Sequence, residues 1–201
     1  MLRPMSLLPF DTLPAHEPRR FVDAQTDLKT WPGIEPWLDR LKDRLSAAAG
    51  VDDLQRWIED WGELCALLDD ESSRRYIAMT CHTDDPAAEK AYLEWVESIE
   101  PKLKPRQFGL ETDYVRHPLR ASLDPKRYGV LDREISTRVE VYREENVALE
   151  TEEARIGQQY QKLSGSLTVT FDGAERTLVE MGRYLEETDR ERRKQAWELT
   201  A

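Results

Sequence analysis

The sequence predicts a mainly α-helical fold of antiparallel helices with one β-hairpin near residues 167–177. Apolar residues recur at intervals of three and four along most of the chain, which places them on one face of a helix. A single segment instead alternates apolar Leu167, Val169 and Phe171 with threonines, and Asp172-Gly173 then supplies the pair that favours a tight hairpin turn. We expect strands near 167–171 and 174–177, packed on helices because an isolated hairpin is only marginally stable.

Three apolar stripes predict helices in the first half of the chain, at residues 34–45, 54–68 and 92–103. Pro36 suits the first turn of the first helix, and Gly50 separates this helix from the second. Pro101 and Pro105 should kink or interrupt the third helix, because proline lacks a backbone donor and clashes with the preceding turn.

The second half begins with Asp124-Pro125, an N-cap followed by a first-turn proline, and helical spacing continues through 135–142 and 156–163. Thr177 and Thr188 each precede a glutamate by three residues, a capping-box pattern that should open two short helices. Residues 1–20 contain four prolines and predict an irregular lead-in to a helical region at 21–201.

The composition argues against several classes of partner. The net charge is −11 and basic residues are interleaved with acidic ones, so no basic face for nucleic acid is expected. No apolar run is long enough to span a membrane, and no signal-peptide pattern is present, so no membrane association is expected. Cys65 and Cys81 give no disulfide framework, which favours a cytoplasmic location.

One short stretch, CHTDD, gathers residue types that bind metals. Cys81 and His82 are neighbours at the end of a predicted helix, so their side chains should point about 100° apart rather than at one metal ion. Asp85 precedes Pro86 and can cap the following helix, with Glu89 in its first turn. We therefore interpret the stretch as a helix junction, and keep a metal-binding protein using Cys81 and His82 as a disfavoured alternative.

Motifs of hydrolytic enzymes are missing from the sequence. The zinc-peptidase motif needs two histidines one helical turn apart, but the histidines stand at 16, 82 and 117, and Pro18 follows His16-Glu17. A glycine-rich phosphate loop and a nucleophile elbow are also missing. We accordingly expect no catalytic, cofactor-binding or metal-ligating residue in this chain.

Longer blocks of sequence nevertheless resemble one enzyme family. The block at 74–105, RRYIAMTCHTDDPAAEKAYLEWVESIEPKLKP, is similar to zinc oligopeptidases of the M3 family, of the oligoendopeptidase F type. Further similar blocks follow in the same order at 16–22, 123–135, 141–173 and 177–198: HEPRRFV, LDPKRYGVLDREI, VYREENVALETEEARIGQQYQKLSGSLTVTFDG and TLVEMGRYLEETDRERRKQAWE. His82 departs from the resemblance, which would place an acidic residue there.

The resemblance implies a helical N-terminal region that packs over a later catalytic domain and helps to wall the channel that admits short peptides. The zinc, its His-Glu-x-x-His helix and the third zinc ligand would belong to that catalytic domain, which is absent from these 201 residues. The chain by itself is then expected to be inactive, with its own catalytic domain and, in the parent enzyme, short peptides as partners. The alternative from another class is a stand-alone acidic helical module that binds a peptide or a protein.

Overall fold

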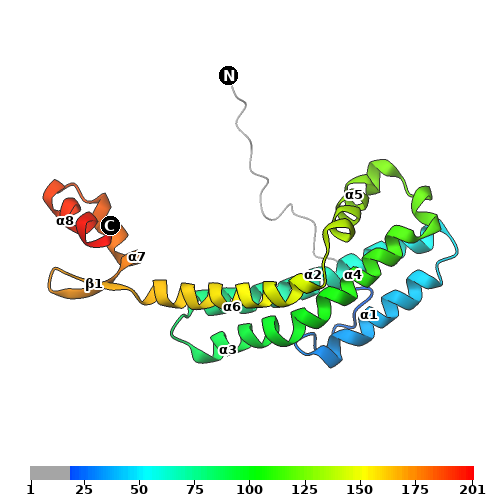
Figure 1. The fold of residues 1–201 in the computed structure, drawn as a ribbon, viewed down its shortest axis with the longest axis horizontal. Coiled ribbons are helices and arrows are strands. Elements are labelled where there is room, and N and C mark those ends of the chain that lie inside the picture. Colours follow the sequence, from blue (N-terminus) through cyan, green and yellow to red (C-terminus); the bar gives the residue numbers. More distant parts are fainter. Residues whose placement is uncertain (1–18) are drawn as a thin grey trace, which may run out of the picture.

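A computed structural model describes residues 19–201 as a helical body followed by a small C-terminal unit, which lies at the far end of a long helix (Figure 1). The irregular lead-in expected at 1–20 falls outside the described residues, apart from Arg19 and Arg20. No helix within residues 19–201 is both long enough and apolar enough to cross a membrane.

The helical body begins with two helices that run in opposite directions, α1 (Trp31–Ser46) and α2 (Val51–Cys81) (Figure 1). A continuous helical stretch then comprises α3 (Pro86–Glu94), the π-helical turn η2 (Trp95–Ile99) and α4 (Glu100–Arg116). The 3₁₀ turn η3 (Pro118–Ser122), α5 (Pro125–Val141) and α6 (Glu145–Ser166) complete the body. α6 packs against α4 and η2 and continues beyond them toward the C-terminal unit.

The C-terminal unit contains β1 (Thr168–Phe171), β2 (Ala174–Thr177), α7 (Leu178–Met181), the 3₁₀ turn η4 (Gly182–Glu186) and α8 (Arg190–Thr200). The strands pair antiparallel, and their turn has φ values of 53° at Asp172 and 74° at Gly173. Both values lie in the left-handed region that a two-residue hairpin turn requires. The predicted fold class, mainly α with one hairpin, is therefore confirmed.

The prolines affect the helices only in part as the sequence predicts. α1 begins at Trp31, with Pro32 in its first turn, so Pro36 lies inside the helix rather than at its start. The third helix is interrupted at Pro101, as predicted, because Pro101 lies in the first turn of α4, whereas Pro105 lies inside α4 without ending it. The irregularity is the π-helical turn just before Pro101, where hydrogen bonding between residues five apart leaves room for the missing proline donor.

The last helix is capped by a residue that the sequence analysis passed over. Thr177 and Glu180 form the expected capping box of α7. At α8, however, the cap is Asp189 and not Thr188, because the Asp189 carboxylate accepts hydrogen bonds from the backbone N–H groups of Glu191 and Arg192. The carbonyl of Thr188 instead accepts a hydrogen bond from the Arg193 guanidinium at 3.0 Å.

The buried residues form two separate hydrophobic clusters. The larger one joins α1, α2, η2, α4 and α5 with the segment before α1, and Trp57 lies in it, 1% exposed. The smaller one belongs to the C-terminal unit and consists of Phe171, Met181, Tyr184 and Ala196, with Val169 packed against it. The hairpin is thus stabilised by α8 and η4 rather than by the helical body.

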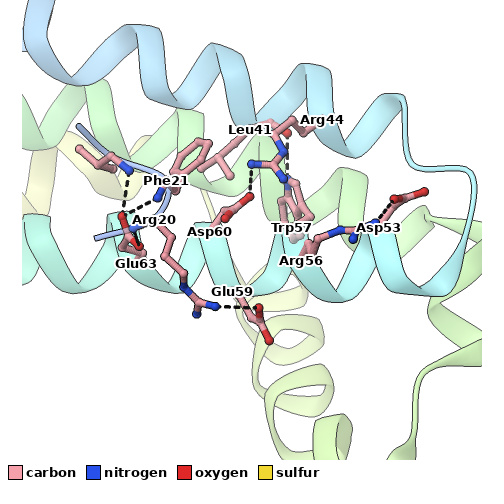
Figure 2. A network of polar contacts seen from close by, with 11 residues as sticks. Arg20, Phe21, Leu41, Arg44, Asp53, Arg56, Trp57, Glu59, Asp60 and Glu63 are labelled. Atoms are coloured by element: carbon pink, nitrogen blue, oxygen red, sulfur yellow. Dashed lines mark hydrogen bonds and ion pairs between the residues drawn. The ribbon is translucent and has the colours of Figure 1, made fainter. Parts of the chain in front are cut away.

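Glu63 on α2 fixes the segment that precedes α1 (Figure 2). One carboxylate oxygen accepts the backbone N–H groups of Phe21 and Val22, at 3.0 and 2.8 Å, and the other accepts that of Arg20 at 2.8 Å. Burial acts to raise the pKa of Glu63, but the three backbone donors together with the charge of Arg20 outweigh it and lower the pKa. The ionised carboxylate therefore holds Phe21 and Val22 in the core.

We expect this anchor to weaken in acid. A carboxyl whose pKa is lower in the folded state contributes stability above its unfolded pKa, and loses it as the pH falls through the folded value. Glu63→Gln should therefore reduce the free energy of unfolding by about 1–3 kcal/mol at neutral pH, a magnitude typical of hydrogen bonds to a charged group. Denaturant titrations at neutral pH and near pH 3 would check this, since the difference from the wild type should shrink in acid. A difference that is equal at both pH values would contradict it.

Candidate functional site

The CHTDD stretch joins two helices in the structure, as the sequence predicts. Cys81 is the last residue of α2, His82 is its C-cap, and the Asp85 side chain caps α3 by accepting the Ala87 N–H at 2.9 Å. The backbone turns between them through a hydrogen bond from the Asp85 N–H to the His82 carbonyl at 3.0 Å. His82 and Asp85 thus lie at the end of one helix and at the start of the next.

The side chains that could bind a metal ion are dispersed over the described part of the chain. Residues 19–201 contain no group of three or more His, Cys, Asp or Glu side chains placed to hold a metal ion. His117 lies at a different junction, where its Nδ1 accepts the Leu119 N–H at 3.3 Å as the N-cap of η3. His16 lies outside the described residues.

We predict that Cys81, His82 and Asp84 hold no zinc. Replacing Cys81 with serine should leave the zinc content of the purified chain unchanged and far below one ion per molecule, as measured by elemental analysis. Cys81→Ser is a mild substitution, because this cysteine is exposed. Stoichiometric zinc in the wild type that disappears in the variant would refute the junction interpretation.

Residues beyond the junction contact α6, which the sequence did not indicate. Glu89 of α3 accepts hydrogen bonds from the Gln158 side-chain amide and the Lys162 ammonium of α6, both at 2.7 Å. Burial opposes its ionisation, but the Lys162 hydrogen bond, the largest contribution, and Gln158 lower the pKa of Glu89. A recess of about 300 Å³ lies beside this contact, with His82 and Tyr160 in its walls. Glu89 and Gln158 are 69 residues apart in the sequence, so no local sequence pattern indicates that they are in contact.

A larger recess lies between α2, α4, α5 and α6, and we call it the four-helix groove. Its volume is about 700 Å³, and its walls are formed by Trp61, Cys65, Asp69, Lys104, Gln107, Phe108, Glu111, Arg138, Val141, Tyr142, Arg143, Asn146 and Glu150. Sequence reasoning missed the groove, because its lining comes from helices far apart in the chain. Among the groove residues, Cys65 is half-buried, and its side chain packs against the larger cluster.

Two ion pairs hold the walls of the groove together. The Arg138 guanidinium contacts Glu111 at 2.7 Å, and Glu111 is only 8% exposed. Burial raises the pKa of Glu111, although Arg138 acts in the opposite direction. Lys104 contacts Glu150 at 2.8 Å and Glu100 at 3.3 Å. Burial acts to lower the pKa of Lys104, but the two glutamates outweigh it, so the pKa is raised and the lysine stays charged.

The remaining groove residues are aromatic or sulphur-containing. Phe108 and Tyr142 stack with ring centroids 4.0 Å apart and an interplanar angle of 15°. The Tyr142 hydroxyl is buried and makes no hydrogen bond with any described residue. The Trp61 indole N–H is also buried and faces the Cys65 sulphur, which acts to lower the pKa of that thiol. Burial, assisted by the charge of Asp69, raises the pKa of the Cys65 thiol to about 12, so this thiol is protonated and is not a nucleophile.

One side of α6 carries exposed apolar side chains, interrupted by the exposed Glu152 and Glu153 in the turn after Leu149. Its helical spacing is as predicted, but Leu149, Ile156, Tyr160 and Leu163 are 66, 54, 69 and 64% exposed. At 100° per residue these four positions lie within about 60° of one another around the helix. Helical periodicity at 156–163 therefore marks a face that the described residues leave open, and not a core face of this chain.

Comparison with known proteins places the chain among peptidases. Residues 21–142 match the family described as the Peptidase M3 N-terminal domain. No curated protein matches the chain significantly.

Solved structures share the fold. PZ peptidase A, determined with an inhibitor, superposes with a TM-score of 0.77 at 21% identity, over 90% of this chain and 32% of that one. A structure described as oligoendopeptidase F from Bacillus anthracis str. Ames gives 0.76 at 20% identity, over 89% of this chain and 32% of its own. A further oligoendopeptidase F gives 0.77 at 22% identity, over 90% and 32%.

The chain spans about a third of the length of each of these solved structures. The family match covers more than half of this chain and includes α1 to α5. The chain belongs to the M3 peptidase family, and the part of its helical body up to the end of α5 matches the N-terminal domain of that family.

Proposed function

We propose that the chain is the N-terminal, channel-forming segment of a zinc metallo-oligoendopeptidase that cleaves short peptides, and that it does not catalyse by itself. The observation that carries the proposal is the uncovered apolar face of α6 on a fold shared with M3 peptidases. We further propose that this segment acts in the cytoplasm, since the two cysteines, Cys65 and Cys81, are free thiols.

The open face of α6 has the properties of a docking surface. Contiguous exposed apolar patches are uncommon on monomeric proteins and mark sites of interaction. Each large apolar side chain that becomes buried contributes about 1.5–3 kcal/mol, so four such residues on one helix are enough to anchor a partner. In this proposal the partner is the catalytic domain of the same peptidase, and α6 would form part of the seam along the peptide channel.

Residues 19–201 do not fit the family's zinc ion. A catalytic zinc site needs three protein ligands, and the described residues bring no such group together. We therefore propose that zinc and the water it activates belong to the catalytic domain. The contribution of this chain would be to limit the size of the peptides that reach that site.

A second candidate, a stand-alone acidic module that binds peptides or proteins, is favoured by one observation, the four-helix groove with its mixed charges. The two candidates make different demands on α6. A stand-alone module has no need of an apolar face on this helix, whereas a channel segment requires it.

The test is association with an M3 catalytic domain that carries a His-Glu-x-x-His helix, measured by titration with the purified chain. We expect a one-to-one complex, at least about tenfold weaker for Ile156→Asp/Tyr160→Asp, since tenfold in affinity corresponds to about 1.4 kcal/mol. Val130→Asp is the matched control, because Val130 is equally exposed but lies on α5. Failure to associate, or equal losses in both variants, would contradict the docking role.

The second half of the test concerns catalysis. The purified chain, with and without added zinc, should leave a quenched fluorescent oligopeptide intact. Zinc-dependent hydrolysis by the chain alone would overturn the proposal that it is not catalytic.

A further inference from the structure

Most charged side chains in the four-helix groove already have partners. Arg138 is paired with Glu111, and Lys104 is shared between Glu100 and Glu150. These pairs compensate one another and give a ligand little net charge to recognise. The recognition chemistry of the groove must therefore come from the groups that remain.

One carboxylate and one guanidinium in the groove remain without a charged partner. Asp69, on α2, makes no ion pair or hydrogen bond with any of residues 19–201. Arg143 uses one nitrogen, Nη1, to donate to the backbone carbonyls of Glu140 and Tyr142, at 2.9 and 2.6 Å. Its other donors meet no carboxylate in the described part of the chain. The groove thus offers one free negative and one free positive group, from two different elements.

The surface between these charges suits peptide groups. The stacked rings of Phe108 and Tyr142 form a flat apolar surface that can take a side chain. The volume of about 700 Å³ lies within the range of pockets that hold ligands of drug-like size, as a tripeptide is.

We propose that the four-helix groove binds a short peptide with free termini, its ammonium at Asp69 and its carboxylate at Arg143. Arginine suits a terminal carboxylate because its planar fork can donate two parallel hydrogen bonds. A central aromatic or aliphatic side chain would lie on the Phe108–Tyr142 stack. The inference deepens the proposed function and rests on it only for the choice of a peptide, rather than another zwitterion, as the ligand.

Calorimetric titration of the purified chain with the tripeptide Gly-Phe-Gly tests the inference. Free Gly-Phe-Gly should bind at least about tenfold more tightly than the same peptide acetylated at its N-terminus and amidated at its C-terminus. Asp69→Asn and Arg143→Gln should each weaken binding of the free peptide by about tenfold, equivalent to about 1.4 kcal/mol.

Matched controls are available close by in the sequence. Asp70 follows Asp69 but pairs with Arg74 at 2.8 Å outside the groove, and Arg133 is an exposed arginine of α5 outside the groove. Asp70→Asn and Arg133→Gln should bind the free peptide as the wild type does. Thermal unfolding of all four variants would confirm that each is folded.

The assignment of each terminus can be separated by singly blocked peptides. With the peptide acetylated at its N-terminus only, the wild type and Asp69→Asn should bind with equal affinity. With the peptide amidated at its C-terminus only, the wild type and Arg143→Gln should bind with equal affinity, as expected for directly coupled groups. The inference is overturned if free and blocked peptides bind equally, if no binding of the free peptide is measurable, or if the control variants lose as much affinity as the groove variants. None of these outcomes affects the association of α6 with a catalytic domain, so the failure of one proposal is distinguishable from that of the other.

Discussion

Gly33→Ala should destabilise the chain by about 3 kcal/mol, the upper part of the range for overpacked sites. A Cβ atom added at Gly33 would lie 1.7 Å from the backbone carbonyl oxygen of Asp27, far inside van der Waals contact. The obstacle is backbone and not the end of a flexible side chain, so α1 or the turn before it must move. Denaturant unfolding of the variant would measure the loss.

Gly62→Ala is the control for this prediction. Gly62 lies within α2, and an added Cβ would meet nothing within 4 Å. Alanine there should stabilise the chain by about 0.4–1 kcal/mol, because it reduces the conformational freedom of the unfolded state. If both variants were stabilised, the close approach of Asp27 to α1 would be wrong.

Trp57→Ala should cost about 3–5 kcal/mol, as is typical of truncating a large aromatic residue in a core. Trp57 is 1% exposed, stacks on Tyr114 with ring centroids 5.8 Å apart, and contacts Trp61 at 4.9 Å between centroids. Its indole N–H also donates to the Leu41 carbonyl at 2.8 Å, which ties α2 to α1 (Figure 2). Chemical denaturation followed by far-UV circular dichroism would give the change in unfolding free energy.

Two further variants separate packing from exposure. Trp57→Phe keeps much of the buried surface but loses the hydrogen bond to Leu41, so its cost should lie between that of alanine and zero. Trp197→Ala should change stability by less than about 1 kcal/mol, because Trp197 is 59% exposed. Equal losses at Trp57 and Trp197 would contradict the placement of the core in the helical body.

Features that depend on neighbouring residues were predictable from the sequence. The hairpin follows from one alternating segment and the Asp172-Gly173 pair, whose positive φ values the structure confirms. The cap of α3 follows from Asp85 before Pro86. For α8 the sequence predicts a cap at Thr188, one residue before the actual cap, because Thr188 and Asp189 are both suitable cap residues. In the structure Asp189 caps the helix, and Arg193 donates to the carbonyls of Glu187 and Thr188 just before it.

Contacts between distant parts of the chain could not be predicted in this way. Glu63 shows no sign in the sequence of binding three backbone N–H groups some 42 residues away. Asp69 of α2 and Arg143, between α5 and α6, line one groove only because these helices belong to the same body. Periodicity likewise shows that α6 is an amphipathic helix but not what covers its apolar face.

By itself, therefore, the sequence determined the helices, the hairpin, the caps of α3, α5 and α7 and the family, because each depends on local backbone energetics or on extended similarity. Only the tertiary structure decided which apolar face is buried, which charges are paired and which remain free. The physical reason is that burial and ion pairing are set by the packing of helices distant in the chain, and residue spacing does not encode which helices meet.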